Sequence, residues 1–342
     1  MSGSDELIVR IAEVPGPVVV VLSMGGTVSS VREPGREGSV PRVDASALLG
    51  DVGSLSGLSV VSETFRMLPS SSVTGADVTA LAARIRSLGA TGRVTGVVVT
   101  HGTDTLEETA FTLELLAAAT DVPVVVTGAM RDGSDAAPDG PGNLRDAVLA
   151  AASSQVRGCG VLVVFDSVIH SARWVSKETT FRAAGFSSAP LGPIGWIVED
   201  RVRVFSRPLL GFRLGPGEGP TAPIAVLATV PGDDMIVADA ALRAGYRGVV
   251  LAGAGGGHVA RAAVPVLSAV AAEIPVVVST RVPRGPALSK TYGYPGSEVS
   301  LRHAGCLMSG VLDAAKSSVL LSALVARGAD RAAVAEAFAA FA

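Results

Sequence analysis

Two apolar segments that end directly in glycine–threonine turns constrain the fold of this chain more than any other feature. Segment 18–23 runs into the sequence GGT, which ends at Thr27, and segment 97–100 runs into HGTD, which contains Thr103 and Asp104. In a parallel sheet both turns lie at the carboxyl edge of the strands, where open α/β folds build their sites. The pattern therefore predicts two threonine hydroxyls and one carboxylate at a single sheet edge, a set suited to nucleophilic chemistry rather than phosphate binding.

Strand and helix signals alternate along the chain, which is typical of parallel α/β architecture. A stretch rich in glycine and proline, 206–221, has little apolar periodicity and is interpreted as a linker. We expect an N-terminal catalytic α/β domain over 1–205, with a mainly parallel sheet flanked by helices, and a smaller C-terminal α/β domain over 222–342. The expected strands are 18–23, 59–65, 95–100, 123–127, 160–165, 194–198, 223–229, 247–252 and 275–279, and the expected helices are 76–88, 104–119, 141–154, 234–244, 259–271, 312–326 and 330–341.

Composition excludes several classes of function. At 342 residues the chain is long enough for two ordinary domains. Its apolar runs are shorter than the roughly 18 residues that a membrane-spanning helix requires. A formal net charge of −3 gives no support for a nucleic-acid surface. The first residues are acidic and lack a basic leader, so we expect no signal peptide and a cytoplasmic location.

Cysteine and histidine usage points away from a metal site. Cys159 and Cys306 lie far apart in apolar sequence, which predicts buried free thiols rather than a disulfide or metal pair. The four histidines show no metal-ligand spacing. No metal is therefore expected, and the sequence contains no signal for an organic cofactor either.

Each motif also has a purely structural interpretation. GGT alone fits a tight turn in which glycine supplies a positive φ, and the third glycine of a dinucleotide-binding fingerprint is missing. Asp104 fits the N-cap of the expected helix 104–119, with Glu107 completing a capping box. A third strand, however, again enters a turn, GAMR at 128–131, which precedes DGPGNL at 139–144.

In this order and spacing, the three segments resemble the signature blocks of the bacterial-type asparaginase/glutaminase family: a GGT block, an HGTDT-E block and a GAMR…DGPxNL block. The resemblance extends from about residue 17 to about residue 326 and is highly specific in combination. It implies a cofactor-independent amidohydrolase. Thr27 would attack a side-chain amide, form a covalent acyl-enzyme and release ammonia, which agrees with the need to activate a weak hydroxyl nucleophile.

The resemblance also implies roles for other residues of the N-terminal domain. Thr103 and Asp104 would belong to the second catalytic group. Lys177 falls where the family places its catalytic lysine, although it also fits a surface cation. Asp104 would take the substrate α-ammonium as well. The implied substrate-binding positions are Ser70 for the α-carboxylate, Gly102 in the HGTD turn and the backbone of Ala129 against the amide.

Two residues of the C-terminal domain would serve the site of a neighbouring subunit, by the same resemblance. His258 follows the glycine-rich turn 253–257, where many relatives carry asparagine, and Glu298 corresponds to the site glutamate of the family. The alternatives without a functional role are a histidine that caps the next helix, for His258, and an exposed loop carboxylate, for Glu298. The family implies a homotetramer built as a dimer of dimers.

One departure from the family pattern concerns a tyrosine. Relatives commonly place a tyrosine on the loop after GGT, where it assists the nucleophile, but residues 28–44 contain none. Tyr292 and Tyr294 are the candidate substitutes. The third tyrosine, Tyr246, follows apolar sequence and is expected in the core.

These observations predict an L-asparaginase that converts L-asparagine to L-aspartate and ammonia. A glutaminase-asparaginase of mixed specificity stays open, because one methylene is worth only about 1–3 kcal/mol in a pocket. A non-catalytic amino-acid-binding protein of the same fold is the alternative from another class. The missing loop tyrosine favours it, whereas Thr27, Thr103, Asp104 and Lys177 oppose it.

Overall fold

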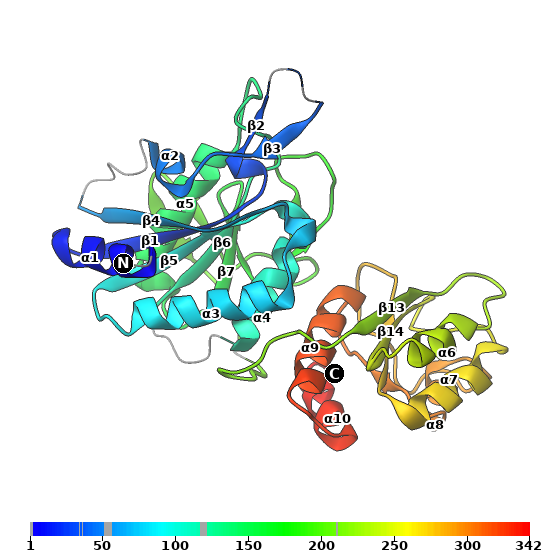
Figure 1. The fold of residues 1–342 in the computed structure, drawn as a ribbon. Coiled ribbons are helices and arrows are strands. Elements are labelled where there is room, and N and C mark those ends of the chain that lie inside the picture. Colours follow the sequence, from blue (N-terminus) through cyan, green and yellow to red (C-terminus); the bar gives the residue numbers. More distant parts are fainter. Residues whose placement is uncertain (1–2, 34, 36, 51–56, 117–121, 210) are drawn as a thin grey trace. The chain divides into compact units, whose positions relative to one another are not determined.

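The computed structural model describes residues 3–33, 35, 37–50, 57–116, 122–209 and 211–342. The chain divides into two compact units, Met1–Pro216 and Gly217–Ala342 (Figure 1). The division falls inside the glycine- and proline-rich stretch 206–221. Each unit is built on its own sheet, with helices packed against both faces.

The first unit contains an eight-stranded sheet in the order β12-β11-β8-β7-β6-β5-β1-β4. Strands β4, β1, β5, β6 and β7 are parallel, and β8, β11 and β12 continue the sheet antiparallel. Ser23 pairs with Thr100, and Thr100 pairs with Thr127, so three neighbouring strands end at the same level. The strands are β1 (Val18–Gly25), β4 (Ser59–Leu68), β5 (Val94–Thr100), β6 (Val124–Thr127), β7 (Val161–Phe165), β8 (Val168–Ser171), β11 (Gly195–Val198) and β12 (Arg201–Val204).

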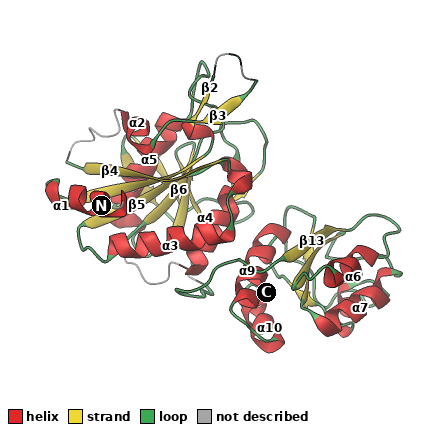
Figure 2. Ribbon diagram, viewed as in Figure 1, coloured by secondary structure: helices red, strands yellow, loops and turns green. Residues whose placement is uncertain are grey.

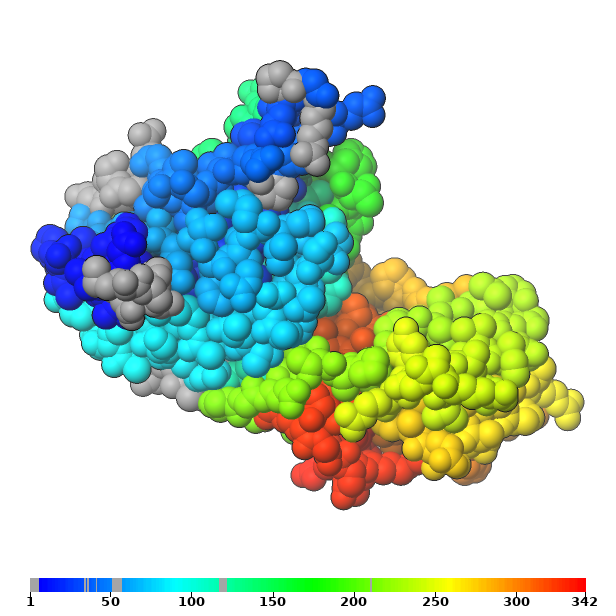
Figure 3. All heavy atoms as spheres, in the orientation of Figure 1, coloured from blue at the N-terminus to red at the C-terminus, as the bar shows by residue number. Residues whose placement is uncertain are grey.

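Helices cover both faces of this sheet because its central strands are apolar on both sides. Val18 and Val20 pack in one core with α1, α3 and α4, whereas Val19 and Val21 pack in the other core with α5. Figure 2 shows the resulting three layers, and in Figure 3 the atoms of α3 cover much of the visible face. The helices are α1 (Gly3–Glu13), α2 (Ala45–Leu49), α3 (Gly75–Gly89), α4 (Leu106–Leu116) and α5 (Gly140–Ala152); the small hairpins are β2 (Ser30–Arg32) with β3 (Ser39–Pro41), and β9 (Ser176–Lys177) with β10 (Phe186–Ser187).

The second unit is a four-stranded parallel sheet in the order β13-β14-β15-β16. Its core joins Val249 and Val278 of the sheet to Leu267 and Leu301 of two helices. The elements are β13 (Ile224–Ala228), α6 (Ile236–Arg243), β14 (Gly248–Gly253), α7 (Ala263–Glu273), β15 (Val276–Thr280), α8 (Glu298–His303), β16 (Leu307–Met308), α9 (Ala314–Ala326) and α10 (Arg331–Ala339).

The predicted α/β class with a mainly parallel N-terminal sheet is confirmed, and every expected strand and helix has a counterpart. The last expected residues of helix 104–119, 117–119, lie outside the described residues. Several short or irregularly patterned elements were not predicted from the sequence, including α1, α2, β8, β12 and α8. Cys159 and Cys306 are buried free thiols as predicted, but Tyr246 is 39% exposed rather than in the core.

Over the described ranges, no helix is both long enough and apolar enough to cross a membrane.

Candidate active site

The turn that carries Thr27 lies directly against the turn that carries Thr103. Gly26 has a φ of 82° and donates its N–H to the Leu68 carbonyl at 3.2 Å. A Cβ placed on Gly26 would lie 2.2 Å from the backbone nitrogen of Gly102, so only glycine permits this approach. A short 3-10 turn, Thr27–Ser29, follows at once and leaves Thr27 partly buried beside the end of β1.

Lys177 joins the two polar residues of the HGTD turn. Its Nζ donates to Thr103 Oγ1 at 2.9 Å and to Asp104 Oδ1 at 2.6 Å. The Lys177 side chain is 18% exposed, so it is not a surface cation, whereas the Asp104 side chain is 70% exposed. The Lys177 backbone N–H donates to the carboxylate of Glu107, and β9 pairs with β10 at this position. The structure thus unites a hydroxyl, an ammonium group and an open carboxylate.

The expectation that Asp104 caps the following helix, with Glu107 in a capping box, is wrong. Thr103–Thr105 forms a 3-10 turn whose N-cap is Gly102, and α4 begins only at Leu106. The Asp104 carboxylate instead accepts from Lys177, and the Glu107 carboxylate accepts the Lys177 N–H. The charged partner of Asp104 is Lys177, which comes from a distant segment of the chain. The sequence around Asp104 contains no sign of that partner.

Ser70 lies at the same edge, just after β4. Its Oγ accepts the Asp104 N–H at 3.3 Å, and its carbonyl accepts the Thr105 hydroxyl at 2.8 Å. A Cβ on Gly102 would come within 2.8 Å of the Ser70 side chain. Ser70 therefore packs directly on the HGTD turn, and its side chain is almost fully buried.

The GAMR turn after β6 is held in place by the DGPGNL segment. The Asp139 carboxylate accepts the N–H groups of Met130 and Arg131, and Asn143 Nδ2 donates to the Gly128 carbonyl at 3.0 Å. These bonds fix the backbone on both sides of the fully buried Ala129. Asp139 and Asn143 are therefore positioning residues. Both belong to the DGPGNL motif, but the sequence alone predicted no role for either of them.

His101 is a further positioning residue that sequence reasoning missed. Its Nδ1 lies 2.7 Å from the Gly102 carbonyl, and its Nε2 lies 3.1 Å from the Thr109 hydroxyl. A carbonyl only accepts, so Nδ1 carries the proton and donates. Burial lowers the pKa of His101 to about 4, against a smaller opposing effect of the Gly102 carbonyl. The ring is therefore neutral at pH 7, and its Nε2 accepts a hydrogen bond from the Thr109 hydroxyl. The ring is fixed in this way, and its Nδ1–H group holds the Gly102 carbonyl in place.

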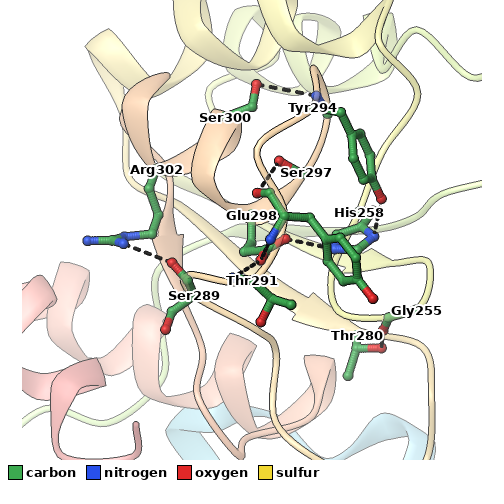
Figure 4. Close-up of polar contacts among 12 residues, drawn as sticks. Gly255, His258, Thr280, Ser289, Thr291, Tyr294, Ser297, Glu298, Ser300 and Arg302 are labelled. Atoms are coloured by element: carbon green, nitrogen blue, oxygen red, sulfur yellow. Dashed lines mark hydrogen bonds and ion pairs between the residues drawn. The ribbon is translucent and has the colours of Figure 1, made fainter.

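The second unit holds a separate polar cluster at the carboxyl end of its sheet (Figure 4). His258, which follows β14, bonds through Nε2 to Glu298 Oε2 at 2.8 Å and through Nδ1 to the Tyr294 hydroxyl at 2.8 Å. The rings of Tyr292 and Tyr294 both meet the His258 ring edge-on. Glu298 is the first residue of α8 and is fully buried, so it is not an exposed loop carboxylate.

Comparison with known proteins agrees with this geometry. The family model described as "Asparaginase, N-terminal" matches residues 18–210, and the model described as "Glutaminase/Asparaginase C-terminal domain" matches residues 223–338. The chain belongs to the asparaginase family. The family resemblance drawn from the three motifs is confirmed, and the two matched ranges fall in the two units of this asparaginase-family chain.

Individual relatives cover most of the chain. A protein of Deinococcus radiodurans named "Probable L-asparaginase" is 38% identical over 324 residues, which is 92% of this chain and 95% of the relative. The "Glutaminase-asparaginase" of Pseudomonas fluorescens biotype A is 33% identical over 73% of this chain and 71% of its own. The crystal structure described as a probable cytoplasmic L-asparaginase from Campylobacter jejuni matches with a TM-score of 0.85 at 27% identity, covering 95% of this chain and all of that one. A Haemophilus influenzae relative is named as periplasmic, so the cytoplasmic location of this chain stays a prediction.

Proposed function

We propose that this chain is an L-asparaginase, which hydrolyses L-asparagine to L-aspartate and ammonia. The observation that carries the proposal is the contact of the Thr27 turn with a turn in which Lys177 bonds both Thr103 and Asp104. A serine, a carboxylate and backbone groups of two further turns surround the same sheet edge. Named relatives with high coverage support the same activity.

In this proposal Thr27 is the nucleophile. Its Oγ forms a bond to the side-chain carbonyl carbon of the substrate and gives up its proton to the amide nitrogen, which leaves as ammonia when the carbon–nitrogen bond breaks. Water then cleaves the acyl-enzyme, which releases L-aspartate and restores the Thr27 hydroxyl. Thr103 is held by Lys177 in an orientation suited to hydrogen-bond the departing nitrogen. Placing these groups before reaction avoids reorganisation in the transition state.

Substrate recognition is assigned to the groups around the catalytic turns. The exposed Asp104 carboxylate takes the α-ammonium group, since only one of its oxygens is bonded to Lys177. Ser70 takes the α-carboxylate, while Gly102 and the backbone of Ala129 line the amide end. Mixed action on glutamine is the second candidate, which the named Pseudomonas relative supports.

We further propose that the enzyme works as a homotetramer, a dimer of dimers, in which His258 and Glu298 serve the site of a neighbouring copy. No metal and no organic cofactor takes part in the proposed reaction.

The test is ammonia release from L-asparagine and, separately, from L-glutamine. We expect activity in the wild type and its loss in Thr27→Ala and Lys177→Met, by about 100-fold or more. Lys290→Met is the matched control, because Lys290 is also a lysine but is exposed. The ratio of the rates of ammonia release from L-asparagine and from L-glutamine determines the substrate specificity. Binding of an amino acid without ammonia release by the folded wild type would show a binding protein instead.

A further inference from the structure

A cavity of about 290 Å³ lies in the first unit, between the segment that follows Thr27 and the start of α5. Three parts of the chain enclose it: the Thr27 turn with β2, the start of α2, and the segment that leads into α5. Its apolar walls are formed by Val28, Val31, Val43, Leu48, Pro141 and Leu144. Ligand pockets measure roughly 300–1,000 Å³, so a cavity at the lower end of this range suits a small molecule.

The cavity is separate from the candidate active site but lies next to it. In the described part of the chain, its walls include none of the residues proposed for catalysis or for substrate recognition. Val28, however, directly follows Thr27 and packs close to Gly140. A Cβ placed on Gly140 would lie 3.1 Å from Val28 Cγ2 and 3.4 Å from the Cβ of Ala129. A molecule in the cavity therefore contacts the wall on which the Thr27 turn rests.

Two hydrogen bonds fasten the hairpin of β2 and β3, which projects from the body of the first unit (Figure 1). Ser39 Oγ donates to the Asp132 carboxylate at 2.6 Å, and Ser134 Oγ accepts the Arg32 N–H at 3.1 Å. Between these two partners lies Gly133, which lines the cavity. The walls are thus held in place before a ligand binds, which lowers the entropy cost of binding.

Arg131 is the only charged residue among the described residues that line the cavity. Within the described ranges its guanidinium donates one hydrogen bond, to the Ala137 carbonyl at 3.3 Å, so most of its N–H donors stay open. The one polar side chain besides Arg131 in the walls is Ser30, whose hydroxyl already donates to the Gly26 carbonyl at 2.8 Å. The polar part of the cavity is therefore a cation with donors to spare.

The carboxylates near the cavity have partners of their own. Asp44 accepts at the start of α2, Asp132 accepts from the hairpin, and Asp139 accepts from the GAMR turn. In the described structure none of the three is bonded to the Arg131 guanidinium. Arg131 is therefore positioned to pair with the anion of a ligand.

We propose that this cavity binds a small carboxylic acid with an apolar body. Its carboxylate pairs with the Arg131 guanidinium, whose planar fork matches that group, and its hydrocarbon part packs on the apolar walls. Among the described residues, the walls carry no carboxylate to take an ammonium group, so the cavity selects against free amino acids. The inference goes beyond the proposed amide hydrolysis and does not depend on it.

Isothermal titration calorimetry of the full chain tests the site, with sodium octanoate as the probe. We expect octanoate to bind saturably, one molecule per chain, and about 10-fold or more tighter than 1-octanol, because only the carboxylate pairs with Arg131. Octylamine, which carries the opposite charge, is expected to bind more weakly than either. Equal affinities for octanoate and 1-octanol, or no saturable binding of octanoate, would overturn the proposal.

Two pairs of variants locate the bound octanoate. Arg131→Gln is expected to weaken octanoate binding by about 10-fold and to leave 1-octanol binding unchanged. Arg32→Gln is its control, because Arg32 is exposed and does not line the cavity. Ala47→Phe places a ring in the cavity and is expected to abolish binding, whereas Ser46→Phe, at an exposed position outside the walls of the cavity, leaves it as in the wild type.

Thermal unfolding shows which of these variants are folded. Unchanged octanoate affinity in folded Arg131→Gln or folded Ala47→Phe would place the ligand elsewhere and overturn the proposal. Since no turnover is measured, the result is independent of the proposed function. A wild type that binds octanoate as expected but releases no ammonia overturns the amide hydrolysis and supports the site, and the reverse result does the opposite.

Discussion

At the scale of single residues, the first unit contains two buried histidines, His101 and His170, that are neutral at pH 7. His101 is 0% exposed and secures the backbone of Gly102, and His170 is 3% exposed with Nδ1 at 2.8 Å from the Ser188 hydroxyl. Burial lowers the pKa of each ring to about 4. An unfolded chain binds protons at these rings below about pH 6.5, where the folded chain does not.

The pH dependence of stability follows from this difference. Because both folded-state pKa values are depressed, their contribution is fully present above about pH 6.5 and is lost as the pH falls towards 4, by up to about 3 kcal/mol per histidine. Urea unfolding across this range is the measurement. His170→Asn is expected to reduce the pH dependence by roughly half, whereas the exposed His303→Asn leaves it as in the wild type. An unaltered slope in His170→Asn would contradict a neutral buried ring.

At the scale of elements, the candidate site depends on strands that end in register and on glycines that let the following turns touch. Gly26 and Gly102 meet backbone to backbone, and Gly128 approaches the His101 carbonyl, where a Cβ would lie at 2.4 Å. A side chain at any of these positions would push the two neighbouring turns apart. The glycines therefore determine the spacing of the hydroxyl groups as well as the conformation of single turns.

Gly26→Ala tests this close approach, with Gly16→Ala as its control. Both glycines have positive φ values, 82° and 73°, but a Cβ on Gly16 meets nothing within 4 Å. We expect Gly16→Ala to cost about 1–2 kcal/mol of unfolding free energy through backbone strain alone, with normal activity. Gly26→Ala adds overpacking of about 1–3 kcal/mol and abolishes ammonia release. Full activity in Gly26→Ala would show that the two turns need not touch.

At the scale of the whole molecule, the two units contribute different chemistry. The first holds Thr27, Thr103, Asp104 and Lys177. The second holds the hydrogen-bonded series of Glu298, His258 and Tyr294. The proposed tetramer brings the second set to a neighbouring copy. An isolated chain would then carry two incomplete halves of a site.

Mixing two inactive variants tests this arrangement. Thr27→Ala and Glu298→Gln, unfolded together and refolded, form mixed dimers in which one of the two shared sites has both residues intact. We expect recovery of roughly a quarter of the wild-type activity after equal mixing, and none after mixing without subunit exchange. If each chain supplies its own complete set, the co-refolded mixture stays as inactive as its parents.

Much of the fold and part of the candidate site could be predicted from sequence, because some signals are local. Apolar runs followed by Gly-Thr turns located β1 and β5, and their parallel order followed from alternation with helices. Short elements were not predicted: α8 spans only six residues, which is less than two helical turns and too few for a repeated apolar spacing to show. The predicted cap at Asp104 failed for a related reason, since its true partner, Lys177, stands 73 residues away.

The sequence by itself determined which groups are available and which of them follow strand ends. It also excluded a tyrosine on the loop after Thr27 and left two tyrosines of equal standing, Tyr292 and Tyr294. Only the tertiary structure distinguished their surroundings, because it brings His258, 36 residues earlier in the chain, to the hydroxyl of Tyr294. A hydrogen bond requires a donor and an acceptor within about 3 Å, and separation along the chain says nothing about that distance.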